Sequence, residues 1–288
     1  MKTVKQFFTT ALLASISLGA YAQSIDNEVF IEQVGATNQA DVEVGVSGVS
    51  PFASSAEDNL ADIYQEGESN VAYIGQGNFG GSSANDNEAT IAQKGNGNDA
   101  AIQQGVDIGG ADKSVATISQ DGNANEADIN QGALGSSEKD QASVKQIGDG
   151  NDVLISQGVD GNSELSMASV YQEGTDNVAY IAQGVDGVSE GDKASIHQEG
   201  TANEADIKQA FPGISEDNQA DIKQVGDENT ATIFQGAFGS DPAELNIADI
   251  FQHGDLNQAT INQYGVSDLA NINQSGTGNM ANVTMGTP

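Results

Sequence analysis

The sequence predicts an all-β protein, a parallel β-solenoid of ten strand-turn-strand rungs in which two parallel sheets lie face to face. Three observations support this fold. A unit of the form N-x-A-x-I-x-Q-x-G-x-x-N-x-A-x-I-x-Q-G occurs ten times in 288 residues. Within each half of the unit the recurring residues occupy alternate positions, which is the period of a β-strand. The glycine and asparagine between the halves are typical of a turn.

The first 22 residues are predicted to be a signal peptide, and residues 23–288 a repeat domain with its repeats at approximately 27–286. Lys2 and Lys5 precede a mostly apolar segment at 7–18, and Ala20-Tyr21-Ala22 has the small-residue pattern of a cleavage site. We therefore expect a secreted, extracellular protein. Since no later segment approaches about 18 consecutive apolar residues, we expect no membrane span.

The first strand of each unit is predicted to end at a glutamine. In the second unit the recurring residues are Asn59, Ala61, Ile63 and Gln65, and the residues between them vary from unit to unit. The fixed residues thus share one face of a strand. A helix would place residues i and i+2 about 200° apart and would scatter this set.

The second strand repeats the same pattern eleven residues later, after the turn. Two strands of five or six residues cannot bury a face by themselves, but copies stacked in register at about 4.8 Å per rung enclose a shared interior. Ten such rungs form a column about 48 Å long.

The predicted interior combines isoleucine and alanine with side-chain amides. A buried amide without a partner costs a few kcal/mol, but identical glutamines stacked at strand spacing can donate to and accept from one another. A glutamine occupies this position in ten of ten first halves, which predicts an inner ladder. The ladder consists of Gln33, Gln65, Gln93, Gln120, Gln146, Gln172, Gln198, Gln224, Gln252 and Gln274.

The composition excludes several classes of function. The chain has 9 Lys+Arg, all of them lysine, against 42 Asp+Glu, with a formal charge of -33, so nucleic acid is excluded as a partner. The absence of cysteine excludes disulfides and thiolate sites. We expect no enzyme activity, no catalytic residue, no cofactor and no metal site. His197 and His253 are predicted in different outward columns, and no calcium-loop motif is present.

The repeat resembles that of the curlin family, whose proteins build curli, the functional amyloid fibres of bacterial surfaces. The family repeat is similar to S-x5-Q-x-G-x-N-x-A-x3-Q, and the resemblance covers about residues 27–286. It implies further stacking columns beside the first glutamines. One contains Gln76, Gln104, Gln131, Gln157, Gln183, Gln209, Gln235 and Gln263. The other contains Asn38, Asn70, Asn98, Asn125, Asn151, Asn177, Asn203, Asn229, Asn257 and Asn279.

The resemblance also implies a function. It indicates a subunit that self-assembles into curli-like fibres of the cell surface and biofilm matrix, mediating adhesion and aggregation. The implied partners are other copies of the chain, a curli nucleator subunit and the outer-membrane curli secretion channel. The repeat fits both a major subunit and a nucleator. The alternative is a monomeric β-solenoid adhesin or cation-binding protein.

Three features depart from the family pattern. The Gly-rich targeting segment of about twenty residues is missing, because Asn27 follows the predicted cleavage site by four residues. Nearly every unit carries four to ten extra residues after its second glutamine, which we call the arm and expect to protrude along one edge. The end units are imperfect, with Val44 and Met285 in glutamine positions. Neither end has a polar cap, which favours the addition of another subunit.

Overall fold

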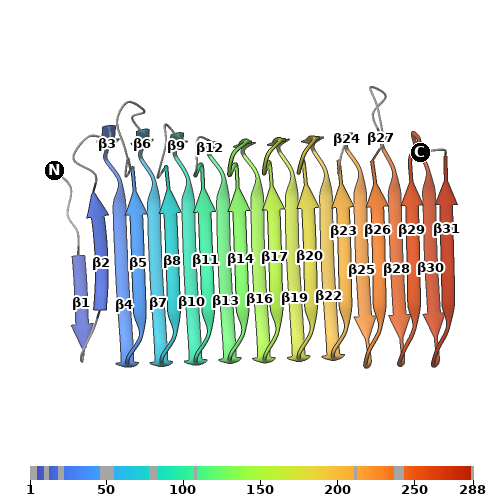
Figure 1. Ribbon diagram of the computed structural model, residues 1–288, viewed down its shortest axis with the longest axis horizontal. Helices are drawn as coiled ribbons and strands as arrows, with labels where there is room; N and C mark the ends of the chain where they lie inside the picture. Colours follow the sequence, from blue (N-terminus) through green and yellow to red (C-terminus); the bar gives the residue numbers. More distant parts are fainter. Residues whose placement is uncertain are drawn as a thin grey trace.

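The structure is a computed structural model that describes residues 5–9, 13–18, 23–45, 55–77, 83–106, 109–210, 213–236 and 243–286. It confirms an all-β parallel solenoid whose strands stack along one long axis (Figure 1). The described residues contain no helix, and therefore none that is long and apolar enough to cross a membrane.

The first sheet contains the strand before the turn of each unit, and every neighbouring pair is parallel. Its strands are β1 (Lys5–Thr9), β4 (Glu28–Ala36), β7 (Leu60–Glu68), β10 (Glu88–Asn96), β13 (Val115–Asn123), β16 (Gln141–Asp149), β19 (Met167–Thr175), β22 (Lys193–Thr201), β25 (Gln219–Val225), β28 (Ile247–His253) and β30 (Leu269–Ser275).

The second sheet contains the strand after the turn. Its strands are β2 (Leu13–Leu18), β5 (Gln39–Val44), β8 (Val71–Gln76), β11 (Asp99–Gln104), β14 (Glu126–Gln131), β17 (Asp152–Gln157), β20 (Val178–Gln183), β23 (Glu204–Gln209), β26 (Thr230–Gln235), β29 (Gln258–Gln263) and β31 (Met280–Met285). We use the word rung for one strand of the first sheet with the strand of the second sheet that follows it.

The register is the one that the repeat predicts. Gln93 pairs with Gln65 on one side and with Gln120 on the other, and Ile91 pairs with Ile63 and Ile118. The isoleucines and alanines of both sheets form one continuous buried core. Buried and outward residues therefore alternate along each strand, as the period of two predicts, and the same positions stay buried from rung to rung.

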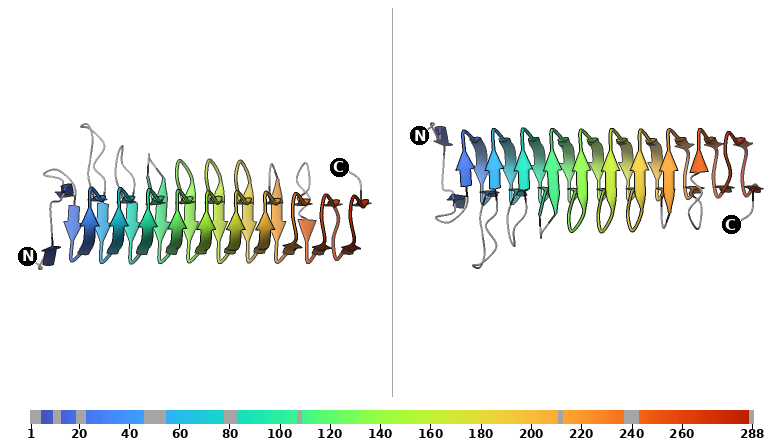
Figure 2. Two further views of the ribbon diagram at one scale, coloured as in Figure 1. Left: turned by 90° about the horizontal axis from the view of Figure 1, so that it is seen from below. Right: turned by 90° about the horizontal axis from the view of Figure 1, so that it is seen from above.

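A third sheet corrects the prediction of two. The arms, expected only to protrude, end in short strands that stack in register: β3 (Gln23–Ile25), β6 (Ser55–Glu57), β9 (Ser83–Asn85), β12 (Gly110–Asp112), β15 (Ser136–Glu138), β18 (Asn162–Glu164), β21 (Val188–Glu190), β24 (Ile214–Glu216) and β27 (Ala243–Glu244). We call this the arm sheet. From β6 to β27 it buries a small alanine or serine of each strand, and in the middle units a loop projects beyond it (Figure 2).

The first and second sheets each have eleven strands, whereas ten rungs were predicted. The difference comes from residues 5–9 and 13–18, inside the predicted signal peptide, which pair in parallel with β4 and β5. The rest of residues 1–22 lies outside the described part of the chain. Cleavage after Ala22 stays a prediction.

A stacked glycine follows the first glutamine of each unit. At Gly67 the backbone has φ +121°, and a Cβ added there would lie 1.9 Å from the carbonyl oxygen of Gly95 in the next rung. Only glycine fits both the conformation and the close approach. The repeated glycine thus allows the strands to leave the first sheet without separating the rungs.

Candidate assembly site: the buried polar ladders

The ten first glutamines form one buried column along the first sheet, as predicted. Gln33 Nε2 donates to Gln65 Oε1, and every later member up to Gln252 donates in the same way to the next. From Gln65 onward the nitrogen–oxygen distances are 2.8–3.1 Å. All these hydrogen bonds point toward the C-terminal rung. The column is therefore an unbroken and unidirectional chain of amides.

The same glutamines also join the two sheets. Gln146 Nε2 donates a second hydrogen bond to the backbone carbonyl of Glu126, at 2.8 Å, and Glu126 begins the second-sheet strand of the preceding rung. Gln172 makes the equivalent bond to Asp152, at 3.2 Å. Each amide thus links its own rung to both neighbours. This satisfies both amide hydrogens in an interior that excludes water.

The second-strand glutamines form another column, as the resemblance implied. From Gln76 to Gln263 each Nε2 donates to the next Oε1 at 2.9 Å. The column is shorter than the first because Val44 and Met285 occupy its end positions. Gln76 Oε1 is consequently buried without a hydrogen-bond partner among the described residues.

The turn asparagines form a third column of opposite direction. The backbone N–H of Asn70 donates to Asn38 Oδ1 at 3.0 Å, and the pattern continues to Asn279. The side-chain nitrogens also donate to the stacked glycine carbonyls, as Asn70 does to Gly95 at 2.9 Å. These asparagines are buried, except for Asn279 in the last rung, which is exposed.

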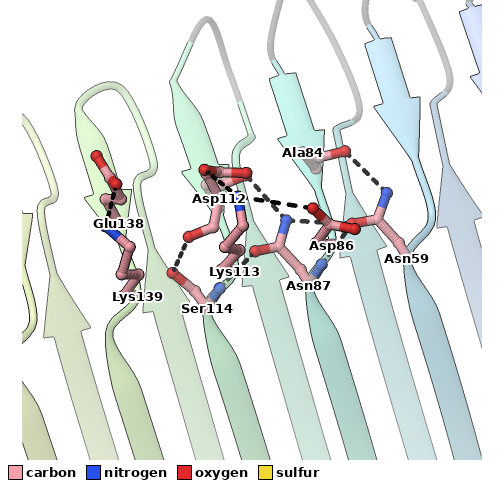
Figure 3. Close-up of polar contacts among 10 residues, drawn as sticks. Asn59, Ala84, Asp86, Asn87, Asp112, Lys113, Ser114, Glu138 and Lys139 are labelled. Atoms are coloured by element: carbon pink, nitrogen blue, oxygen red, sulfur yellow. Dashed lines mark hydrogen bonds and ion pairs between the residues drawn. The ribbon is translucent and has the colours of Figure 1, made fainter.

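A fourth column was not predicted as a ladder, although the repeat placed its asparagines on the inner face. It lies where the arm sheet meets the first sheet, and its members precede each first glutamine by six residues. They are Asn27, Asn59, Asn87, Ser114, Asp140, Ser166, Asp192, Asn218, Asn246 and Asp268. Asn59 Nδ2 donates to the carbonyl of Ala84 at 2.8 Å, and Asn87 makes the same bond in the next unit (Figure 3). The repeated asparagine of the unit was the available signal.

The two ends of the first column are complementary. At the N-terminal end Gln33 Oε1 is buried and has no hydrogen-bond partner among the described residues. At the other end Gln274 Nε2 donates to the carbonyl of Gln258 at 2.9 Å, and no further glutamine follows it. One end therefore offers an amide acceptor and the other an amide donor, at equivalent positions of the repeat.

The two histidines lie among the outward residues of the first sheet. No group of three or more His, Cys, Asp and Glu side chains in the described residues is placed to hold a metal ion. His197 stacks on Tyr171 with ring centroids 4.8 Å apart, and its Nε2 lies 2.6 Å from Glu199 Oε1. His253 lies in the column of Glu199 and Val225, so the two histidines are in different columns, as predicted.

Three segments of the chain match the family described as Curlin associated repeat. They are residues 56–84, 216–241 and 246–276. Each segment contains at least one first glutamine together with the turn asparagine that follows it, which are residues that form the ladders. No curated protein matches the chain. The chain thus contains curlin associated repeats in both early and late units of its solenoid.

Proposed function

We propose that this protein is a secreted structural subunit that polymerises into curli-like amyloid fibres on the cell surface, where the fibres mediate adhesion and aggregation. Other copies of the same chain are its main partner, and a nucleator subunit and an outer-membrane channel are the further partners. The protein has no catalytic role in this proposal.

The observation that carries the proposal is the unbroken first glutamine column. Its hydrogen bonds all point one way, from Gln33 to Gln274, and its two ends are complementary. Stacking the last rung of one subunit on the first repeat rung of another places Gln274 Nε2 next to Gln33 Oε1. The Gln33 acceptor, which β1 covers in the full chain, then gains a donor from the other subunit, and the column continues across the junction.

The C-terminal end supports this direction of growth. Strands β30 and β31 each pair with one neighbour only, so their outer edges carry unpaired backbone groups. Apolar side chains are exposed there, with Met280 80% and Leu269 66% exposed. A second copy covers both the backbone edge and this apolar surface.

Removal of the signal peptide prepares the other end. Strands β1 and β2 lie on β4 and β5, the first strands of the repeats. Cleavage after Ala22 removes β1 and β2 and leaves β4 and β5 as open edges. In this proposal the mature chain therefore has two open and matching ends.

The proposal is tested by incubating purified residues 23–288 at tens of micromolar in salt-containing buffer. We expect unbranched fibres by electron microscopy, thioflavin binding, and fibre-diffraction spacings of about 4.7 and 10 Å. The same chain with Gln33→Leu lacks this acceptor and should assemble more slowly. A mature chain that stays monomeric for days overturns the proposal and favours a monomeric solenoid adhesin.

A further inference from the structure

The fourth column contains two carboxylates in fully buried positions. Asp140 and Asp192 are 0% exposed, and they occupy the position that asparagine holds in five other units. Neighbouring members of the column are Ser114, Ser166 and Asn218, none of which is charged. A buried carboxylate is costly unless its oxygens accept enough hydrogen bonds. The hydrogen bonds that these two carboxylates accept therefore determine the cost of burying them.

An asparagine in this column donates to the next rung. Asn59 Nδ2 donates to the carbonyl of Ala84 at 2.8 Å, and Asn218 Nδ2 donates to that of Ala243 at 2.7 Å. These bonds attach the first sheet to the arm sheet from one rung to the next (Figure 3). An ionised aspartate cannot make this bond because it has no donor. The equivalent carbonyls for Asp140 and Asp192 are those of Ser163 and Ser215.

The arm sheet and the next member of the column supply donors to the two carboxylates. Ser137 Oγ donates to Asp140 Oδ2 at 2.6 Å, and the N–H of Ser166 donates to Oδ1 at 2.9 Å. Asp192 accepts from Ser189 Oγ at 2.6 Å and from the N–H of Asn218 at 2.8 Å.

The arm residues change together with the column. The central residue of the arm strand is serine in β15, β18, β21 and β24. Asp140 follows the first of these four strands and Asp192 follows the third. The central residue is alanine in β6, β9, β12 and β27. Hydroxyl donors are thus concentrated in the units around the two buried carboxylates.

The charged groups nearby do not neutralise either carboxylate. Around Asp140 they are Glu138, Lys139 and Glu164, and Lys139 pairs with the two glutamates. Around Asp192 they are Glu190, Lys193, Glu216 and Asp217, all on the exposed or half-exposed side of their segments. Desolvation by burial is the main reason that the pKa of Asp140 and that of Asp192 are each raised to about 6. Serine and backbone hydrogen bonds oppose this rise.

We infer that Asp140 and Asp192 form a pH-responsive attachment of the arm sheet, in which each carboxyl group takes up a proton in mild acid and then donates to the next rung as asparagine does. The direction follows from linkage. The folded chain takes up these protons as the pH falls through about 6, whereas the unfolded chain takes them up near 3.8. Folding is therefore favoured progressively as the pH falls from about 7 toward 4, and this gain is lost as the pH rises.

The test compares residues 23–288 with the variant Asp140→Asn/Asp192→Asn. The denaturant midpoint of each freshly prepared monomer is measured by circular dichroism at pH 7.5 and pH 5.0. We expect the wild-type midpoint to be higher at pH 5.0. The variant should have a higher midpoint than the wild type at pH 7.5, and it should lose at least half of the pH-induced shift.

A matched control removes two exposed carboxylates, in Asp121→Asn/Asp160→Asn, and should retain the wild-type shift. Ser189→Ala removes a donor to the ionised Asp192, so it should lower the midpoint more at pH 7.5 than at pH 5.0, and Asp192→Asn should restore it. The inference is overturned if the first variant titrates like the wild type. It is also overturned if that variant does not fold, because asparagine already fills this position in five units.

Discussion

The side-chain amide of a buried first-column glutamine donates hydrogen bonds to both neighbouring rungs. The number of these bonds determines how much stability is lost when the glutamine is replaced. Gln146 Nε2 donates to Gln172 Oε1 and to the carbonyl of Glu126, while its own Oε1 accepts from Gln120. A side chain of similar size without polar atoms leaves those partners buried and unpaired. An orphaned buried polar group costs about 1–3 kcal/mol.

Gln146→Leu should therefore destabilise the monomer by about 2–4 kcal/mol and lengthen the assembly lag. The neighbouring outward Lys145→Ser should change stability by about 0.5 kcal/mol or less, because Lys145 is exposed. Denaturant unfolding and thioflavin kinetics of both variants check the difference. Equal effects at the two positions would show that the buried amide ladder does not control folding.

At the residue scale the sequence was informative where residue identity recurs and less so where it varies. Glutamine in ten of ten first halves predicted the first column, which the structure confirms. The fourth column was not predicted as a ladder because asparagine, serine and aspartate alternate in it. These three residues share a short polar side chain, but they use it differently: Asn87 and Asp140 accept from the N–H of the next rung, whereas the Ser114 hydroxyl contacts the Ser137 hydroxyl of the arm sheet.

In the turn, the backbones of successive rungs approach each other closely at a glycine. The first glycine of the turn, Gly95 in the third unit, has φ +112°, and a Cβ added there would lie 1.9 Å from the carbonyl oxygen of Gly122. Gly97, two residues later, has φ +65° and nothing within 4 Å of an added Cβ. Ala124 and Ala202 occupy the position of Gly97 in other units with φ 53°. The two glycines of one turn therefore have different constraints.

Gly95→Ala should destabilise the monomer by about 3 kcal/mol or more, because the overlap with the next rung adds to the cost of a positive φ. Gly97→Ala should cost about 1–2 kcal/mol. Thermal or denaturant unfolding of the two single variants measures both values. A Gly95→Ala variant as stable as the Gly97→Ala variant would mean that the rungs do not approach each other as closely as described.

At the element scale the arm sheet shows what the repeat pattern could not reveal. Arms vary in length between units, and their strands have only two or three residues, too few for a period of two to be recognised. A Ser-Glu pair recurs in β15, β18, β21 and β24 and was a repeated signal there. Register in this sheet is imposed by the longer strands beside it.

The whole molecule is a highly charged column, with a formal net charge of -33. Stacked units place acidic side chains close together, as where Glu173 pairs in register with Glu199. Their neighbour Val225 interrupts the column of charges. Repulsion between subunits is therefore reduced along the column but not removed.

Salt should shorten the assembly lag of the mature chain without changing the strand spacing of the fibre. The Debye length falls from about 30 Å at 0.01 M to about 3 Å at 1 M, so repulsion between rungs of adjoining subunits is screened. Thioflavin kinetics in 10 and 500 mM sodium chloride measure the effect. An unchanged lag would show that surface charge does not limit assembly, and a much stronger effect of calcium at matched ionic strength would indicate specific cation sites.

Mass per length of the fibre tests the central claim most directly, because it distinguishes subunits stacked end to end from subunits that each form a single layer. The whole sequence has a mass of 29.5 kDa, and its residues 23–288, stacked as ten rungs of about 4.8 Å, give a single filament of about 6 kDa per nm. Scanning transmission electron microscopy of unstained fibres makes the measurement. We predict this value or a small multiple of it for bundled filaments. A filament near 60 kDa per nm, the value for one chain per 4.8 Å layer, would contradict the solenoid stacking.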